Sequence, residues 1–289
     1  MSNKKINIIL DNDGSSDDAI AFALASNSSK INLIAVVSSY GSNTIEINTN
    51  NNAEYISATK TDTKLYIGAG ASLDGKTPAI NLFYGEDNKC LAQLEKHKSA
   101  DTKAKNIYKK LWKKIKDHEK VTYVVTGPCT NLANLIYYAG AKLWKHIDEV
   151  VIVGGNPAKS ASNFHADVRA LKTVLDNCTP TIVTQDATEL LVLQKSEIDN
   201  LQGDKKVQKF FKEICNSYFT FKPETTLAIN DGLTILYIIY KYTTETLTNI
   251  GVDNTTGKLV KEKGQYSYNN ISFPSKEDIA EQIKSILEF

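Results

Sequence analysis

The stretch "INIILDNDGSSDDAIAFALA" (6–25) decides the fold. An apolar run (6–10) leads directly into a polar segment with four aspartates and then into the helix-like "DDAIAFALA" (17–25). Continuous apolar runs of this length are typical of strands covered on both faces, and a strand followed by a helix begins a parallel βαβ unit. The stretch therefore predicts an α/β protein.

The same alternation continues along the chain. Further strands are expected at 31–39, 65–69, 121–126, 150–155 and 180–184. A lysine-rich amphipathic helix is expected near 101–117, a more helical region over 204–242, a short irregular β region over 251–273 and a last helix near 276–287. We predict a single domain over 1–289, with a mostly parallel, Rossmann-like sheet and helices on both faces.

Composition narrows the possible functions. The formal net charge is +1 and the basic residues are scattered, so neither a nucleic-acid partner nor a membrane surface is expected. No segment approaches the ~18 apolar residues of a membrane helix. The N-terminus lacks the pattern of a secretory signal, and the four cysteines are widely spaced, which indicates reduced thiols in a cytoplasmic protein. They are Cys90, Cys129, Cys178 and Cys215.

The arginine content also bears on the substrate. Arg169 is the only arginine, and the other basic residues are lysines. An AT-rich genome is the simplest explanation of this bias. Since phosphate and carboxylate groups are best recognised by arginine, the bias also favours an uncharged substrate.

Asp11, Asp13, Asp17 and Asp18 form an acidic cluster at the end of the first strand. Asp17 and Asp18 could simply cap the following helix, because carboxylates are favourable at a helix N-terminus. Capping does not explain Asp11 and Asp13. A hard cation does, since Ca²⁺ takes ~6–8 oxygen ligands, usually with several carboxylates among them. Polar residues that end other strands belong to the same sheet edge: Ser42, Asn43, Thr126 and Asn156.

Two enzyme families share parts of this segment. "DNDGS" resembles the nucleophile motif of haloacid-dehalogenase-type phosphatases, whereas the wider stretch resembles the "DTDPGxDDA" signature of nucleoside hydrolases. Three further segments resemble nucleoside hydrolase motifs in the same order: "VTGPCTNLA" (125–133), "VIVGGN" with "ASNFHADVRA" (151–170) and "LAINDGLT" (227–234). The chain is therefore similar to nucleoside hydrolases over residues 6–240, and a phosphatase is the weaker alternative.

The resemblance implies a calcium site and a set of catalytic roles. Ca²⁺ would be held by Asp13, Asp18, the Thr126 carbonyl and Asp231, and Asp13 would also act as general base. Asp11 would lie behind these ligands. The ribose would be bound by Asp17, Asn156 and Asn163, with Ser42 and Asn43 beside them. The implied reaction is hydrolysis of a nucleoside N-glycosidic bond in purine or pyrimidine salvage, by a homodimer or homotetramer.

Three positions depart from the family pattern. Ser42 replaces the usual asparagine, Ala161 replaces the ribose-binding glutamate, and Asn230 replaces a histidine that helps the base to leave. His165 could supply the missing proton donor, although it could equally fill the place of an aromatic residue. An aromatic wall for the base could come from Tyr218, Phe219, Tyr237 and Tyr240, although packing in the core is the simpler role for these side chains.

These departures leave two classes of function open. One is an active hydrolase, with an ordinary or an altered substrate. The other is a calcium-containing protein that binds a ribosyl group and has lost most of its catalytic rate. The departures affect contacts with the sugar and the leaving base, whereas the predicted metal ligands are all retained.

Overall fold

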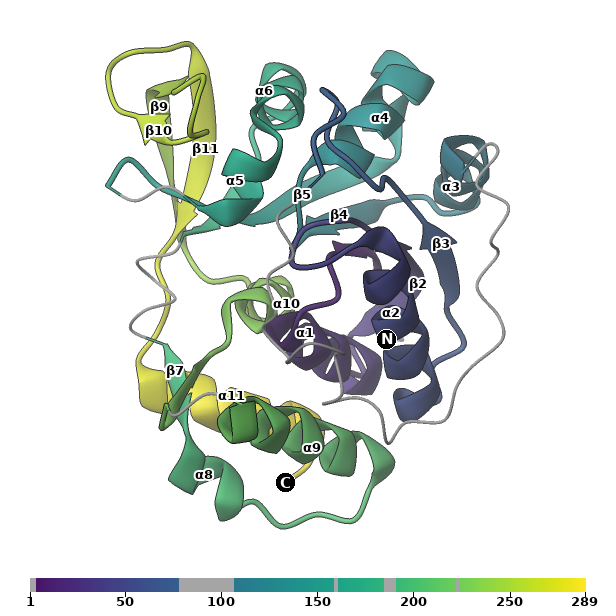
Figure 1. Ribbon diagram of the computed structural model, residues 1–289, viewed down its shortest axis with the longest axis vertical. Coiled ribbons are helices and arrows are strands. Elements are labelled where there is room, and N and C mark those ends of the chain that lie inside the picture. The colour runs from purple at the N-terminus through teal and green to yellow at the C-terminus, as the bar shows by residue number, and fades with distance from the viewer. Residues whose placement is uncertain (1–3, 78–106, 159–160, 185–190, 222–223) are drawn as a thin grey trace.

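The computed structural model describes residues 4–77, 107–158, 161–184, 191–221 and 224–289, and its centre is a nine-stranded sheet (Figure 1). The strand order is β10-β9-β11-β6-β5-β4-β1-β2-β3. Strand β9 pairs antiparallel with both β10 and β11, and the other described strand pairs of this sheet are parallel. The strands are β1 (Ile6–Asn12), β2 (Ile31–Ser38), β3 (Lys64–Ile67), β4 (Val121–Val125), β5 (Ile147–Gly154), β6 (Thr181–Thr184), β9 (Thr244–Val252), β10 (Leu259–Val260) and β11 (Tyr266–Ile271).

Helices cover both faces of the sheet, as the continuous apolar strands require. Along β1, Ile8 and Leu10 belong to one apolar core, while Ile9 belongs to the other. The first core is closed by α1 (Ser16–Asn27), α2 (Ile45–Thr59), α9 (Lys206–Phe221), α10 (Asn230–Tyr240) and α11 (Lys276–Leu287). The second is closed by α3 (Ile107–Lys116), α4 (Thr130–Ala139) and α6 (Val168–Asn177).

Shorter elements complete the described chain. Helix α5 (Ser162–Ala166) precedes α6, a 3₁₀ helix η2 (Gly140–Lys145) follows α4, and α8 (Lys195–Asp199) precedes α9. Strands β7 (Val192–Gln194) and β8 (Thr226–Ala228) form a separate antiparallel pair. In the described part of the chain, no helix has the length and apolar character needed to cross a membrane.

The predicted fold class is confirmed, and most elements lie where they were expected. All six predicted strands are present, and the last helix spans Lys276–Leu287 as predicted. Of the predicted lysine-rich helix, 107–116 is helical and 101–106 lies outside the described residues. The predicted short β region over 251–273 contains β10 and β11. Strand β11 is a member of the main sheet, in parallel register with β6.

The position of β1 decides where a ligand can bind. Strand β1 lies between β2 and β4, so the chain builds the sheet outward in one direction with β2 and β3 and in the other with β4 to β6. At such a reversal of strand order, the helices that follow neighbouring strands cover opposite faces and leave a crevice at the carboxyl ends of the strands. Asp11, Asn12 and Thr126 lie at this edge.

Candidate active site

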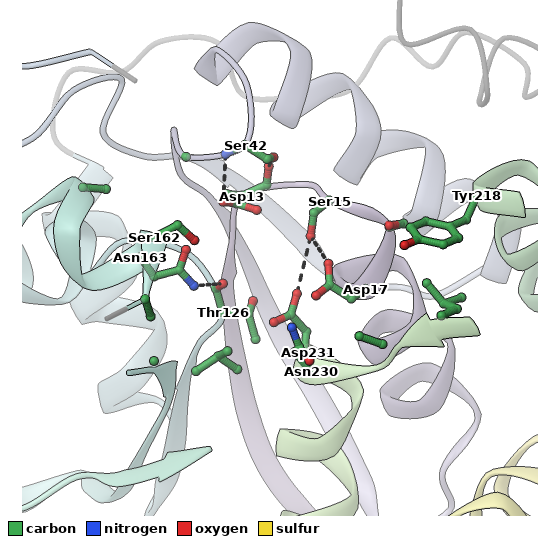
Figure 2. A pocket seen from close by; sticks show the side chains of 18 residues that line it. Asp13, Ser15, Asp17, Ser42, Thr126, Ser162, Asn163, Tyr218, Asn230 and Asp231 are labelled. Carbon is green, nitrogen blue, oxygen red and sulfur yellow. Dashed lines mark hydrogen bonds between the residues drawn. The ribbon is translucent and has the colours of Figure 1, made fainter. Parts of the chain in front are cut away.

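A pocket of about 310 Å³ opens at the predicted edge of the sheet. Figure 2 shows that its labelled side chains come from the ends of β1 and β4, the loop after β2, the starts of α1, α5 and α10, and the C-terminal part of α9. Each of these elements presents an N-terminal or strand-end residue to the same space. The lining is Asp13, Ser15, Ser16, Asp17, Gly41, Ser42, Thr126, Val153, Gly154, Ala161, Ser162, Asn163, Ala166, Tyr218, Leu227, Ala228, Asn230 and Asp231.

Ser15 links the acidic residues of α1 to the start of α10. It caps α1 in a capping box with Asp18, whose Oδ2 accepts the backbone N–H of Ser15 at 3.0 Å. The Ser15 hydroxyl lies 2.6 Å from Asp17 Oδ1, 3.0 Å from Asp18 Oδ2 and 3.4 Å from Asp231 Oδ2. The capping interpretation therefore holds for Asp18, and it accounts for one carboxylate of the cluster.

Asp18 is also fixed from the side of β4. Thr126 Oγ1 donates to Asp18 Oδ1 at 2.5 Å, and the Thr126 backbone N–H donates to the Asp11 carbonyl at 2.9 Å. Asp18 is fully buried, and each of its carboxyl oxygens accepts a hydrogen bond, Oδ1 from Thr126 after β4 and Oδ2 from the N-cap residue Ser15. The start of α1 is thereby fixed against the end of β4.

Asp13 lies on the opposite side of the pocket, under the loop that follows β2. Its Oδ2 accepts the backbone N–H of Ser42 at 2.9 Å, and its own carbonyl accepts the Ser42 hydroxyl at 2.8 Å. The neighbouring Gly41 must be glycine, because a Cβ there would lie 2.2 Å from Asp13 Oδ2. Although Ser42 replaces the family's asparagine, it orients the carboxyl group of Asp13.

Burial and mutual repulsion make the carboxyl groups hard to ionise. Burial, followed by the charge of Asp18, raises the pKa of Asp13 well above its usual value. Burial, followed by the charges of Asp17 and Asp18, does the same to the pKa of Asp231. Burial is also the main cause that raises the pKa of Asp17 to about 6. A bound cation would remove this penalty.

The donor chemistry fits a hard cation, although the side chains do not surround a common point. The charge of Asp18 helps to raise the pKa of both Asp13 and Asp231, so a positive ion among these groups would be favourable. The donors are all oxygens, as Ca²⁺ or Mg²⁺ prefers. Within the described residues, however, no group of three or more His, Cys, Asp or Glu side chains has the arrangement of a metal site.

Asp11 lies beneath the pocket and does not line it. It is fully buried, and its carboxyl accepts from Asn131 Nδ2 at 2.8 Å and from the Tyr123 hydroxyl at 3.1 Å. Burial raises its pKa to about 7. A phosphatase would need this residue as an open nucleophile, so its position argues against the phosphatase alternative.

The residues predicted to bind ribose do not all reach the pocket. Asn163 lines it and donates from Nδ2 to the Thr126 carbonyl at 2.7 Å, and Asp17 and Ser42 line it as well. Asn43 and Asn156 are buried behind the lining. Asn156 Oδ1 accepts the backbone N–H of Ala158 at 2.8 Å, which is a local turn.

The two residues predicted to assist departure of the base lie in different places. Asn230 lines the pocket, whereas His165 is exposed and lies outside the wall that the described residues form. The geometry therefore gives no support to a catalytic His165. Of the four proposed aromatic residues, Tyr218 alone lines the described pocket, where its hydroxyl donates to Glu224 at 2.6 Å. The Tyr237 hydroxyl instead donates to Glu149 at 2.6 Å.

Sequence reasoning missed several residues of the site. Ser15, Ser162, Leu227 and Ala228 line the pocket but were not predicted to do so. A signal existed for Ser15, because a serine three residues before an acidic residue at the start of a helix is typical of a helix cap. Leu227 and Ala228 lie in β8, which is too short to show a strand pattern.

The fold and the pocket together define an α/β protein with a ligand site at the carboxyl edge of its parallel strands. A family model described as inosine-uridine preferring nucleoside hydrolase matches residues 8–284, and the chain belongs to this family. The resemblance seen in the sequence is thereby confirmed, and it extends beyond residue 240.

The individual relatives share less than a third of their aligned residues with this chain. The pyrimidine-specific ribonucleoside hydrolases RihA of Shewanella sp. strains MR-4 and ANA-3 are each 29% identical over 206 residues, which are 68% of this chain and 64% of the relative. The match thus spans less than two thirds of the length of these curated relatives. Their specificity is a property of those proteins.

Solved structures share the fold over nearly the whole chain. The plant nucleoside hydrolase PpNRh1 superposes with a TM-score of 0.84 at 20% identity, covering 98% of each chain. The purine-preferring ribonucleoside hydrolase from Gardnerella vaginalis superposes with a TM-score of 0.82 at 18% identity, covering 97% of this chain and 98% of its own.

Proposed function

We propose that the protein hydrolyses the N-glycosidic bond of a nucleoside and releases the free base and ribose. The observation that carries this proposal is the buried Asp13 carboxyl group in the pocket wall of a chain that belongs to the nucleoside hydrolase family. Because burial raises its pKa, the Asp13 carboxyl group accepts a proton more readily than an ordinary aspartate does. The pocket around it can hold a small uncharged ligand.

The proposed reaction resembles inverting glycoside hydrolysis. Water attacks C1′ of the ribose, the electron pair of the C–N bond goes to the base nitrogen, and Asp13 takes the proton of the water. The backbone N–H of Ser42 holds the Asp13 carboxyl in place at 2.9 Å. Because general bases must be fixed relative to the attacking water, this hydrogen bond is part of the machinery.

Ca²⁺ is the proposed cofactor. Asp13, Asp18, Asp231 and the carbonyl of Thr126 would hold it. Ser15 and Thr126 hold Asp231 and Asp18 at the junction of α1, α10 and β4, and the charge of Asp18 helps to raise the pKa of both Asp13 and Asp231. When bound, the ion would lower the pKa of the attacking water and fix its position. The side chain of Thr126 is occupied by Asp18, so only its carbonyl is offered to the ion.

The sugar would be held by Asp17 and Asn163, which line the pocket on opposite sides (Figure 2). Ser42 would border the same sugar. Asn43 and Asn156 stay proposed contacts, but each would have to reach past the residues in front of it. Asn230 would face the leaving base together with Tyr218.

A ribosyl-binding protein with little catalytic rate is the second candidate function. Ala161 lines the pocket at the position aligned with the family's glutamate, and its methyl group offers no charge to the developing oxocarbenium ion. The amide of Asn230 can donate a hydrogen bond to the base but does not transfer a proton as a histidine does. Both features would lower the rate more than they lower binding.

One assay separates the candidates. Base release from a panel of purine and pyrimidine nucleosides should be measured with Ca²⁺ and with chelator, for the wild type and for Asp13→Asn. A hydrolase releases base with Ca²⁺ and loses at least about 100-fold of the rate in Asp13→Asn, as expected for a general base. A binding protein retains affinity for D-ribose and releases no base from any nucleoside. Hydrolysis of p-nitrophenyl phosphate that is lost in Asp11→Asn would overturn both proposals.

We further propose that the protein is cytoplasmic, comprises one domain over 1–289, takes part in nucleoside salvage, and forms a homodimer or homotetramer. The described cysteines Cys129, Cys178 and Cys215 are free thiols, which is compatible with a reducing compartment, and Cys90 lies outside the described residues. The oligomeric state rests on the family resemblance. Light scattering coupled to size-exclusion chromatography tests it directly, and a monomer at micromolar concentration would contradict it.

A further inference from the structure

Helix α5 presents Ser162, Asn163 and Ala166 to the pocket, but it is too short to be stable by itself. It has five residues, and its N-cap residue Ala161 makes no side-chain hydrogen bond. Isolated helices shorter than ~12–15 residues are marginal in water, so α5 is placed by tertiary contacts. The geometry of this wall of the pocket therefore depends on what packs against α5.

On one side, α5 rests on the main sheet. Phe164 is fully buried, and a Cβ on Gly154 at the end of β5 would lie 1.9 Å from its ring. Asn163 Nδ2 donates to the Thr126 carbonyl at 2.7 Å. Immediately after the helix, Asp167 accepts the Thr130 hydroxyl at 2.8 Å. These contacts fix α5 from the side of the pocket and at its C-terminal end.

On the other side, the turn between β9 and β10 (253–258) packs directly on the α5 backbone. At Gly257, which has a φ of +69°, a Cβ would lie 2.6 Å from the Phe164 carbonyl oxygen and 2.8 Å from the Phe164 carbonyl carbon. Figure 1 shows the arm formed by β9, β10 and β11 standing beside α5 and α6. Such close backbone contact is possible only without a side chain at residue 257.

The turn is held by its own hydrogen bonds and by the sheet. Asp253 Oδ1 accepts the backbone N–H groups of Thr255 at 3.0 Å and Thr256 at 2.7 Å, and the Asp253 carbonyl accepts that of Gly257 at 3.0 Å. Strand β9 pairs with β11, which pairs with β6 of the main sheet. A Cβ at residue 257 would therefore displace α5 more readily than it displaces the turn.

We propose that Gly257 is a positioning residue of the active site. By allowing the turn 253–258 to pack on the Phe164 carbonyl, it fixes the place from which Ser162 and Asn163 face the sugar. The role in sugar binding rests on the proposed function, whereas the placement of α5 does not. Gly257 is remote in sequence from every other residue of the site.

Three variants test the proposal. Gly257→Ala adds both the cost of a positive φ and the Cβ collision. Gly257→Asn adds the same Cβ but tolerates the left-handed conformation better, so it separates backbone strain from contact with α5. Gly140→Ala is the matched control, because Gly140 has a φ of +59° and a Cβ there would meet no atom of the described residues within 4 Å.

Three quantities should be measured well below each variant's melting temperature: steady-state kinetics on the best nucleoside of the panel, affinity for D-ribose, and hydrogen exchange of 161–170. Both Gly257 variants should lower kcat/KM about 10- to 100-fold, since a displacement of ~1 Å can cost 100-fold. A raised KM should carry most of the loss, with weaker D-ribose binding and faster exchange in 161–170. Gly140→Ala should change only the melting temperature.

Two results would overturn the proposal. In the first, Gly257→Asn behaves as the wild type, which would show that only backbone strain mattered. In the second, the Gly257 variants lower the melting temperature as Gly140→Ala does, while KM, ribose affinity and exchange stay unchanged. If the wild type neither hydrolyses a nucleoside nor binds D-ribose, the proposed function fails, and the exchange comparison still decides whether Gly257 positions α5.

Discussion

Thr126→Val should reveal how strongly the acidic cluster depends on β4. The substitution is close to isosteric, keeps the backbone carbonyl, and removes the hydroxyl that donates to Asp18 Oδ1 at 2.5 Å. A hydrogen bond to a charged group contributes about 1.5–3 kcal/mol, and a buried acceptor left without a donor adds to the loss. Both residues are buried, Asp18 completely, so solvent does not replace the lost donor.

The loss should be visible in both chemical and thermal unfolding. At about 2 °C per kcal/mol for a chain of this size, the melting temperature should fall by roughly 3–6 °C in chelator. Urea denaturation should give a midpoint shift with an unchanged slope. Thr49→Val is the matched control, because Thr49 is buried in α2 and its hydroxyl has no hydrogen-bond partner among the described residues. The control should be neutral or slightly stabilising.

A double-mutant cycle with Asp18→Asn assigns the effect to the pair. The losses of Thr126→Val and Asp18→Asn should fall short of additivity by about 1 kcal/mol or more, as expected for residues in direct contact. If Thr126→Val costs no more than Thr49→Val, or if the two losses simply add, the hydrogen bond does not stabilise the cluster and the reasoning is refuted.

Three further predictions concern the metal, the sugar and pH. Ca²⁺ should raise the melting temperature by mass action on the folded state. Asp231→Asn should abolish this shift, whereas the control Asp148→Asn, at an exposed residue, should keep it. A wild-type melting temperature that responds to neither Ca²⁺ nor chelator would contradict the site. Ala161→Glu should raise kcat/KM for an ordinary ribonucleoside about ten-fold or more, because a charge-assisted hydrogen bond formed in the transition state is worth ~1.5–3 kcal/mol. No change with any nucleoside would mean that Ala161 does not occupy the position of the family's glutamate. Burial raises the pKa of Glu54 to about 7, so the stability linked to its neutral form is present below its unfolded pKa and is lost as pH rises through about 7. Glu54→Gln should therefore raise the melting temperature more at pH 8 than at pH 5, and an equal shift at both values would show that Glu54 does not titrate in this range.

The sequence alone determined the architecture and the acidic centre of the site. Apolar runs separated by helical segments are a local pattern, since a strand buried on both faces must be apolar along its length. Asp13 and Thr126 follow β1 and β4 directly, and Asp17 and Asp18 lie in the first turn of α1, a few residues after β1, so their position at the carboxyl edge followed from the element assignment. The strand pair of β7 and β8 was not predicted from the sequence, because three residues show too little periodicity to be recognised as a strand.

Side-chain direction in α5 was decided by the tertiary structure. Successive residues on a helix point about 100° apart. Once Phe164 is anchored against Gly154, Asn163 and Ala166 face the pocket and His165 is left in solvent. The sequence shows three polar or aromatic candidates side by side, but it cannot show which of them is anchored.

The contacts that complete the site also join distant parts of the chain. Ser15 meets Asp231 of α10, and Gly257 of the β9–β10 turn meets Phe164 of α5. Such contacts depend on how the helices and the arm pack over the sheet, and that packing depends on interactions throughout the core. Local sequence sets which groups are available, because it fixes element type and strand ends. Only the packed structure decides which of those groups meet.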